Sequence, residues 1–220
     1  MLVSIIILTY NAPKYVFKTL CSLNKTNNVD YEVIVVDNAS NILTKFILFI
    51  LKVFGYIDKT AFLSENTLFA KGNNIGSRLA SNDSDLLLLL NSDVKIVDSN
   101  WLKKLTDYHK KGIISYGIVE SAPIRVDGYC FLINTELYKK YELDESFEWW
   151  WSITKLQSQI LKENHDVVGI KNHDNYIIHY GGKSDNKNVN NARGMDVKSE
   201  KVISWFDNRK IKIIDGNKLV

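Results

Sequence analysis

Residues 3–8 read VSIIIL and residues 31–36 read YEVIVV, and this pair of apolar runs decides the fold. Aliphatic and β-branched residues dominate both runs, as they do in strands that are buried on both faces of a sheet. Between the runs, Pro13 suits the first turn of a helix. The apolar residues that give this helix a buried face are Val16, Phe17, Leu20, Cys21 and Leu23. Strand, helix and strand at this spacing predict a right-handed βαβ unit in a parallel sheet.

The same alternation continues along the chain. Five consecutive leucines at residues 86–90 predict a central strand that is buried on both faces. The further elements that the pattern predicts are strands at 60–63, 113–119, 129–133, 167–170 and 176–178, and helices at 72–80, 101–108 and 149–161. Short elements of undecided type are expected at 203–206 and 211–214. We therefore predict an α/β fold with a mostly parallel central sheet that is flanked by helices.

The composition is that of one ordinary globular domain spanning residues 1–220. A hydrophobic content of 45% and a charged content of 24% exclude a disordered chain, a collagen and a disulfide-stapled miniprotein. Basic residues exceed acidic ones by only 28 − 25 = 3, and no nucleic-acid-reading motif is present, so we expect no nucleic-acid partner. Cys21 and Cys130 form no metal or disulfide pattern, which is typical of a reducing compartment. We expect a cytoplasmic location, and the sequence leaves the oligomeric state open.

The N-terminus and the most apolar segment bear on membrane contact. The first eight residues lack a basic region and a cleavage site, so no signal peptide is expected. Residues 42–57 are the most apolar stretch, but Lys45, Lys52 and Gly55 interrupt it, and it is too short to span a bilayer. Two interpretations remain for this predicted helix. We favour burial between the sheet and another element; the alternative is contact with a membrane surface, which would make the protein peripheral to the membrane.

Three polar clusters each follow a predicted strand, namely Thr9-Tyr10-Asn11, Asp37-Asn38 and Asn91-Ser92-Asp93. Ligands of open parallel sheets bind beyond the carboxyl ends of the strands. Any one cluster is explained equally well as a turn, because Asn, Asp and Ser are common turn residues. Three clusters at the same edge of one sheet predict a binding site.

The chain carries neither a phosphate-binding loop of the Walker type nor the glycine fingerprint of nicotinamide enzymes. A pyrophosphate ligand would therefore need a metal ion, for which one or two protein carboxylates suffice. Asp93, at the end of the leucine strand, meets that need. His179 is a candidate second ligand, although a lone histidine is more often structural.

In this order the motifs resemble those of the family 2 glycosyltransferases of the GT-A fold, in particular the rhamnosyltransferase-like branch. The resemblance extends from residue 2 to residue 184. The segments that carry it are the first strand with Thr9-Tyr10-Asn11, VVDNAS at 35–40, FAKGNNIG at 69–76, LLNSD at 89–93, DG at 127–128, DESF at 144–147 and HYGGKS at 179–184.

The resemblance implies a single nucleotide-diphospho-sugar transferase domain. Residues 1–95 would bind the nucleotide, residues 96–184 would meet the acceptor, and residues 185–220 would form a polar loop and tail. The implied donor is a UDP- or dTDP-sugar, and the implied acceptor is a glycan or another hydroxyl compound. The residues implied for donor binding are Thr9, Tyr10, Asn11, Asp37, Asn38, Lys71, Asn73, Asn74, Asn91, Ser92 and Asp93. Asp93 would bind Mn²⁺ or Mg²⁺ between the two phosphates, and His179 would complete the metal shell.

The inverting mechanism of this family requires a carboxylate base, which takes the proton of the acceptor hydroxyl. At the positions where the resemblance predicts acids, this chain carries Ser152, Ile153 and Lys155. Either a neighbouring acid serves from a shifted position, or the alignment through this segment is offset, or the chain has lost its activity. The neighbouring candidates are Glu148, Glu145 and Asp144.

Among these candidates we favour Glu148, because it precedes three tryptophans that could form a sugar platform and raise the pKa of a carboxylate. The alternative is an acid that merely favours a helix start. Residues 149–151 could equally pack in the core, but three consecutive tryptophans cannot all face one core, so we expect at least one of them in a cleft.

The leading hypothesis is a metal-dependent inverting glycosyltransferase. The missing acids motivate an alternative, a catalytically impaired module of the same fold that binds a nucleotide-sugar or a glycan. A nucleotidyltransferase is a weaker third hypothesis, because residues 9–13 do not supply the glycine-rich basic loop that such enzymes need. We also predict that the polar segment 183–200 closes over the donor or acceptor as a lid.

Overall fold

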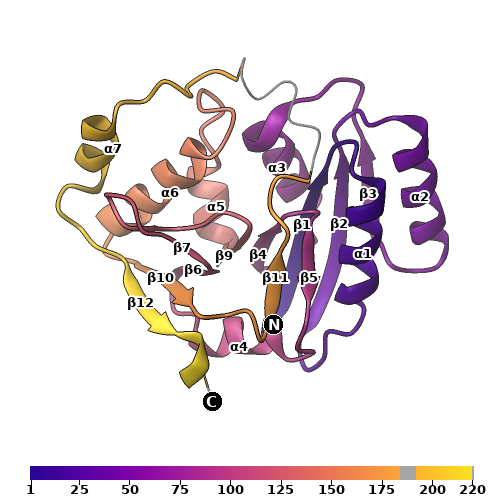
Figure 1. Cartoon of the computed structure of the whole chain (residues 1–220), viewed down its shortest axis with the longest axis horizontal. Helices are drawn as coiled ribbons and strands as arrows, with labels where there is room; N and C mark the ends of the chain where they lie inside the picture. Colours follow the sequence, from indigo (N-terminus) through magenta and orange to yellow (C-terminus); the bar gives the residue numbers. More distant parts are fainter. Residues whose placement is uncertain (184–191, 220) are drawn as a thin grey trace.

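An eight-stranded sheet runs through the molecule in the order β12-β10-β6-β9-β4-β1-β2-β3 (Figure 1). The computed structural model describes residues 1–183 and 192–219. The strands of the sheet are β1 (Leu2–Thr9), β2 (Asp30–Asp37), β3 (Lys59–Phe62), β4 (Ser84–Leu90), β6 (Gly112–Tyr116), β9 (Cys130–Asn134), β10 (Asp166–Lys171) and β12 (Lys212–Asp215). Neighbours pair in parallel, except that β9 runs antiparallel to both β4 and β6. The predicted α/β fold with a mostly parallel sheet is confirmed.

Helices cover both faces of the sheet. The helices are α1 (Pro13–Leu23), α2 (Ile42–Val53), α3 (Leu68–Arg78), α4 (Trp101–Tyr108), α5 (Thr135–Tyr141), α6 (Trp151–Lys162) and α7 (Ser199–Phe206), followed by a 3₁₀ turn at Gly216–Lys218. One core cluster joins the sheet to α1, α2 and α4, and a second joins the opposite face to α3, α5, α6 and α7. The result is a three-layer sandwich whose central strands are buried on both sides, as the apolar runs of β1, β2 and β4 predict.

Two small antiparallel pairs flank the main sheet. Strand β5 (Val94–Ile96) pairs with β11 (Ile177–His179), and β7 (Ile118–Val119) pairs with β8 (Arg125–Val126). The strand predicted at 113–119 is therefore two strands, which separate at Gly117. This glycine has φ +95°, and a Cβ there would lie 2.7 Å from the ring of Tyr129, so only glycine fits.

Helix α2 corrects the prediction that residues 42–57 are buried between the sheet and another element. Its inner residues Leu48 and Leu51 are buried, but Ile42 is 83% exposed, Phe49 61% and Phe54 74%. The helix lies beside β3, the edge strand of the sheet, and no other element among residues 1–183 and 192–219 covers its outer face (Figure 1). The many apolar residues of this segment do form a helix with a buried face, but their number does not indicate whether a second element covers the other face.

The state of the two cysteines and the length of the helices bear on the disulfide and membrane expectations. Cys130 is buried and Cys21 half-buried, and both are free thiols. Within the part of the chain that the structure describes, no helix has both the length and the apolar character needed to cross a membrane.

Candidate active site

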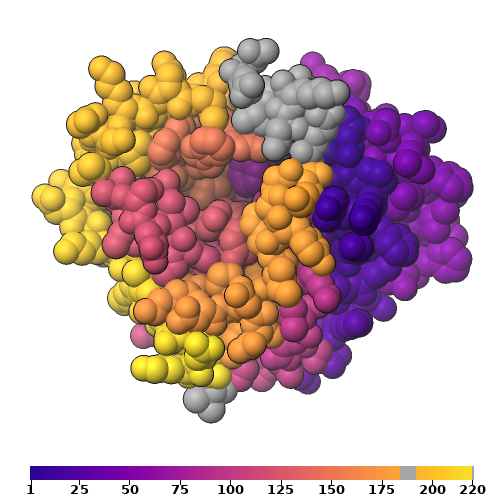
Figure 2. Space-filling view, in the orientation of Figure 1, coloured from indigo at the N-terminus to yellow at the C-terminus, as the bar shows by residue number. Residues whose placement is uncertain are grey.

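The carboxyl ends of β1, β2 and β4 open into a cavity of about 320 Å³. Because these strands are parallel neighbours, the polar residues that follow them share one edge of the sheet. Figure 2 shows this side of the molecule hollowed between the segment near residue 180 and the residues near 150. Of the polar residues predicted at the strand ends, the cavity is lined by Tyr10, Asn38, Asn91, Ser92 and Asp93.

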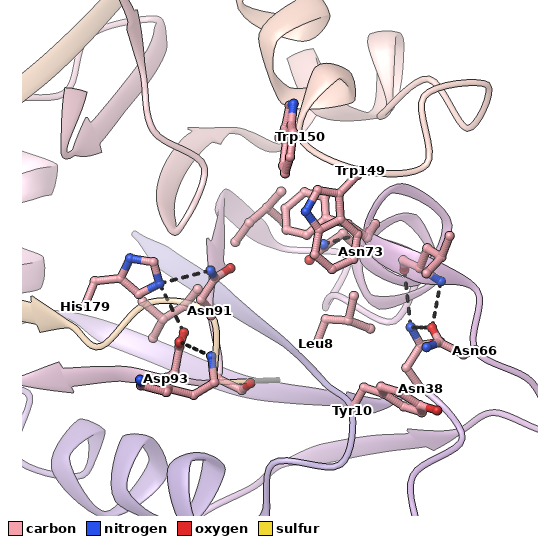
Figure 3. A pocket seen from close by; sticks show the side chains of 17 residues that line it. Leu8, Tyr10, Asn38, Asn66, Asn73, Asn91, Asp93, Trp149, Trp150 and His179 are labelled. Atoms are coloured by element: carbon pink, nitrogen blue, oxygen red, sulfur yellow. Dashed lines mark hydrogen bonds and ion pairs between the residues drawn. The ribbon is translucent and has the colours of Figure 1, made fainter. Parts of the chain in front are cut away.

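At one end of this cavity, Asp93 meets His179 (Figure 3). Strand β5 leads away from Asp93, and its antiparallel pairing with β11 sets His179 opposite Val94. Nε2 of His179 lies 3.2 Å from Oδ1 of Asp93 and 3.4 Å from Nδ2 of Asn91. The imidazole stacks on the ring of Tyr129 at a centroid distance of 4.2 Å. Two residues that lie 86 positions apart thus form one polar cluster.

The cluster has the donor set of a cation site that is shared with phosphates. Asp93 is 5% exposed, and its second oxygen accepts the backbone N–H of Lys183 at 3.3 Å. Two ligand atoms of one octahedral cation lie about 3 Å apart, close to the separation of the Asp93 oxygen and the His179 nitrogen. The described residues contain no group of three or more His, Cys, Asp or Glu side chains that could hold a metal alone. A divalent ion would therefore take its remaining ligands from substrate phosphates and water, as Mg²⁺ commonly does.

At the other end of the cavity, Asn38 organises the loop that precedes α3 (Figure 3). Its Nδ2 donates to Oδ1 of Asn66 at 2.6 Å, and its Oδ1 accepts the backbone N–H of Thr67 at 2.7 Å. Asn66 in turn accepts the N–H of Leu68, which starts the helix at a positive φ of 59°. These bonds explain why α3 begins four residues before the predicted start at residue 72. Sequence reasoning missed Asn66, whose loop carries no apolar pattern.

Thr9 and Asp37 pair at the ends of β1 and β2, directly before the cavity residues Tyr10 and Asn38, but they do not line the cavity. Both are buried, and neither Oγ1 of Thr9 nor Oδ1 of Asp37 has a hydrogen-bond partner. The other oxygen of Asp37 accepts the backbone N–H of Ser40 at 3.2 Å. Burial raises the pKa of Asp37, and the bonds from Ser40 only partly oppose this. Unsatisfied buried polar atoms are rare in folded proteins, and this carboxylate oxygen has no donor from the described residues.

The other predicted donor residues divide into those that reach the cavity and those that support the fold. Asn73 lines the cavity. Asn74 is buried instead, and its amide accepts the N–H of Leu143 and donates to the carbonyl of the same residue and to Glu145. Lys71 is exposed beside Glu65. Asn11, with φ +49°, accepts the N–H of the residue that caps α2.

A second cavity of about 310 Å³ adjoins the first. The residues that line both are Phe69, Asn91, Trp149 and Trp150. Trp150 is 48% exposed, whereas Trp151 packs against Trp205 at 6.5 Å and under the guanidinium of Arg125. The expectation that at least one of the three tryptophans faces a cleft is met by two of them, and they stand at the boundary between the cavities.

The three carboxylates predicted as bases line neither cavity. Glu148 accepts the backbone N–H of Arg193 at 2.7 Å and its Nε at 2.8 Å. Burial raises the pKa of Glu148, but these bonds outweigh it and the net shift is downward. Asp144 forms an ion pair with Lys155, and Glu145 accepts a hydrogen bond from Asn74. Their assignment as the base remains a prediction.

Two residues of the second cavity were not among the predicted site residues, although the resemblance includes Asp127 in its acceptor-side segment. Asp127 lines the second cavity from the loop after β8, and Tyr129 supports His179 from the same loop. The Asp-Gly pair before an apolar strand was the available signal, but it reads equally well as a turn. Of the predicted lid, residues 184–191 lie outside the described residues; of the remainder, Lys183 contacts Asp93 and Arg193 contacts Glu148.

Solved structures with the same fold include several glycosyltransferases. S. aureus TarS 1–349 in complex with UDP-GlcNAc aligns with a TM-score of 0.54 at 21% identity, over 66% of this chain and 49% of that one. The mannosyltransferase PcManGT from Pyrobaculum calidifontis, in complex with GDP-Man and Mn²⁺, gives 0.65 at 15% identity, over 75% and 53%. The chain thus spans about half the length of these two proteins. A further TarS 1–349 structure gives 0.65 at 17% identity, over 95% of this chain and 71% of that one.

No curated protein sequence matches the chain. The model of the family described as glycosyl transferase family 2 does match, over residues 4–170. This span contains the strand ends, Asp93, both boundary tryptophans and Asp127, and it covers well over half of the chain. On this ground the chain belongs to glycosyl transferase family 2.

Proposed function

We propose that the protein transfers a sugar from a UDP- or dTDP-sugar to a hydroxyl group of a glycan or a similar acceptor, with inversion at the anomeric carbon and with Mn²⁺ or Mg²⁺. One observation carries this proposal: two adjoining cavities share a tryptophan boundary, and the first holds Asp93 beside His179. A donor and an acceptor that meet at this boundary would bring the reacting atoms together.

Family membership supports a nucleotide-sugar as the donor. Proteins of the same fold have been solved with UDP-GlcNAc, with GDP-Man and Mn²⁺, and with UDP, GalNAc and Mn²⁺. The choice of UDP or dTDP rests on the resemblance of the motifs to the rhamnosyltransferase-like branch. The nucleobase of the donor would lie toward Tyr10 and Asn38, and its diphosphate toward Asp93, since these residues occupy opposite ends of the cavity (Figure 3).

Each residue of the site has a defined task in this mechanism. Asp93 and His179 would hold the metal, which supplies Lewis-acid stabilisation of the departing diphosphate. Trp149 and Trp150 would contact the sugars and exclude water from the reacting centre. Asp37 would accept a hydrogen bond from the nucleobase or the ribose of the donor with its unpartnered oxygen.

We also propose the division of labour that the resemblance implies, with residues 1–95 for the nucleotide and 96–184 for the acceptor. The lining of the second cavity supports it, because most of its residues fall between positions 119 and 154. The first cavity draws mainly on positions 8–93. The exceptions, which approach it from the later part of the chain, are Trp149, Trp150, His179, Gly182 and Lys183.

Titration calorimetry of UDP- and dTDP-sugars with and without Mn²⁺ tests the donor. We expect binding that strengthens with Mn²⁺ and loses this dependence in Asp93→Asn. Absence of binding to any nucleotide-sugar under both conditions would reject the proposal. Binding without transfer across a broad acceptor panel would favour the alternative, a module that binds a nucleotide-sugar or a glycan.

We further propose that the outer face of α2 contacts a membrane that contains anionic lipids. Its exposed apolar residues are Ile42, Leu43, Phe46, Phe49, Val53 and Phe54, with Phe62 of β3 beside them. The only charged side chains between Asp37 and Asp58 are Lys45 and Lys52, so the face carries positive charge without an acid. Lysine is depleted at protein interfaces relative to the rest of the surface. The combination of phenylalanines and lysines on one helix therefore fits insertion among lipid headgroups.

Co-sedimentation with lipid vesicles tests this surface. We expect the protein to bind vesicles of phosphatidylcholine mixed with phosphatidylglycerol more strongly than phosphatidylcholine alone. The double variant F46S/F49S should stay in the supernatant. Ile203→Ser changes an apolar position on α7 that is 48% exposed, and it should bind like the native protein. A native protein that ignores both vesicles, or that forms a dimer which F46S/F49S dissolves, would overturn the proposal.

A further inference from the structure

We propose that Asp127 is the catalytic base of this protein. The inference rests on the proposed glycosyl transfer. Of the described residues that line the two cavities, two carry a carboxylate: Asp93 in the first and Asp127 in the second. With Asp93 placed at the diphosphate, Asp127 is the carboxylate on the acceptor side.

The surroundings hold Asp127 in place and leave its charge unpaired. Its backbone N–H donates to the carbonyl of Gly117 at 3.1 Å, and its carbonyl accepts Oγ of Ser115 at 2.7 Å. Oδ1 accepts the N–H of Gly128 at 2.7 Å. Among the described residues no other hydrogen bond or ion pair occupies its carboxylate. Oδ2 can therefore take the proton from the hydroxyl group of a sugar acceptor in the cavity.

The preceding residue is fixed as firmly. The amide of Gln157, which is fully buried on α6, bonds both the N–H and the carbonyl of Val126, at 2.9 and 3.0 Å. Catalytic groups must be held by neighbours whose own positions are locked. The loop between β8 and β9 therefore presents Asp127 from a rigid frame.

The other acids near the boundary have different tasks. Glu148 is bound through both oxygens by Arg193, and Asp144 is paired with Lys155. A carboxylate that is engaged by a cation is a weaker proton acceptor and would have to break that pair to act. Asp127 forms no ion pair with a described residue, although the guanidinium of Arg125 in the same cavity interacts with it electrostatically.

Ile153 explains why the base would come from this loop. It occupies a position where the resemblance predicts an acid, it is buried, and it lines the same cavity as Asp127. Its side chain faces the neighbouring Gly128, where a Cβ would lie 3.1 Å from its Cγ1. Ile153, at the position where the resemblance predicts an acid, thus lies beside Gly128, the residue that follows Asp127. Both Ile153 and Asp127 line the second cavity.

In the proposed sugar transfer, each bond that forms is matched by a bond that breaks. The acceptor oxygen forms a bond to the anomeric carbon, and its proton passes to the Asp127 carboxylate. The bond from the anomeric carbon to the diphosphate breaks, and its electron pair leaves with the nucleoside diphosphate. Proton transfer to solvent then restores the carboxylate.

The experiment compares Asp127→Asn with Glu120→Gln. Asparagine keeps the shape of the side chain and the oxygen that accepts the N–H of Gly128. Glu120 is an exposed carboxylate between β7 and β8, close in sequence to Asp127, and its side chain lines neither cavity. We expect Asp127→Asn to lower the rate of transfer by about 10²- to 10⁴-fold, with donor affinity by calorimetry unchanged within about twofold. Glu120→Gln should match the native protein, and Asp127→Glu should recover part of the rate.

The outcomes separate this inference from the proposed function. A native protein that transfers sugar, with Asp127→Asn equally active, overturns the role of Asp127 and leaves the function intact. Loss of transfer in Glu148→Gln with activity retained in Asp127→Asn assigns the base to Glu148. A native protein that binds no nucleotide-sugar, or that binds donor without any transfer, rejects the proposed sugar transfer and the base together.

Discussion

Strand β2 carries a buried carboxylate near each end, and the two are treated in opposite ways. Glu32, at the amino-terminal edge of the sheet, accepts hydrogen bonds from the hydroxyl of Ser4, from both the N–H and the hydroxyl of Ser81, and from Lys59. Burial acts to raise the pKa of Glu32, but these bonds outweigh it and lower the pKa to about 2. At the carboxyl-terminal edge, Asp37 keeps one oxygen without a partner, and its pKa is raised by burial.

The difference teaches which edge of the sheet serves stability and which serves a ligand. A buried carboxylate whose oxygens are all bonded contributes to folding, whereas one left unsatisfied costs free energy until something binds. Both residues lie on one strand, so burial alone does not distinguish them. What differs is the supply of donors: both oxygens of Glu32 accept hydrogen bonds, whereas only one oxygen of Asp37 does.

The largest effect is expected at Asp93, on the ligand edge. Replacing it by asparagine removes the negative charge that would hold a divalent ion beside His179. We expect transfer to fall by about 10³-fold, the scale on which loss of transition-state charge stabilisation acts. Initial rates over a range of Mn²⁺ concentrations measure this effect. A variant that keeps both the native rate and the native dependence on Mn²⁺ would show that Asp93 binds no catalytic ion.

Glu32→Gln tests the stability edge. We expect the free energy of unfolding at pH 7 to fall by about 1 to 3 kcal/mol, because a charged hydrogen-bond network is replaced by a neutral one. The folded-state pKa of Glu32 is depressed from 4.5 to about 2, so its stabilisation is complete above pH 4.5 and is lost as the pH falls toward 2. The deficit of the variant should shrink over that range in denaturant titrations, while donor affinity at pH 7 stays native. A deficit that does not change with pH would contradict this account.

Asp37→Asn should behave in the reverse way. Its folded-state pKa is raised, so the ionised form is penalised at neutral pH and the penalty is relieved as the pH falls. We expect stability at pH 7 to be unchanged or higher by about 1 kcal/mol, and donor affinity to fall about tenfold through loss of a charged acceptor. Denaturant titration and calorimetry on one preparation measure both. A destabilised variant with native affinity would place Asp37 among the structural carboxylates.

The fold was predictable because its signals are contiguous. The runs of β1, β2 and β4 are mostly apolar, as is typical of strands that are covered on both faces. The exposed face of α2 was not predictable in the same way, since periodicity reports which residues are apolar but not whether the helix lies at the edge of a layer. The break at Gly117 depends on the ring of Tyr129, a contact that strand pairing creates.

The site was predictable where it follows strand ends and not where it depends on loops. Asn91 and Asp93 follow β4 directly, and the structure sets them beside His179. Asn74 lies in a motif of the resemblance, yet its side chain faces α5 and holds Leu143, which only the three-dimensional packing reveals. Asp127 reaches the second cavity because β9 reverses direction between β4 and β6, and no local pattern announces that reversal.

The smallest effect is expected at Glu148, the carboxylate that the sequence favoured as the base. It resembles Glu32 more than Asp37, because both its oxygens are occupied, here by Arg193. Glu148→Gln should therefore change the rate of transfer by less than about threefold, well below the 10²-fold or more that general-base catalysis supplies. Because the bonds of Glu148 hold the segment before α6 to the segment around residue 193, the variant should instead increase proteolytic cleavage near Arg193. Arg193→Gln, which removes the same contact from the other side, should reproduce that cleavage pattern. A large loss of transfer in Glu148→Gln alone would instead show that the contact with Arg193 opens during turnover and frees the carboxylate to act.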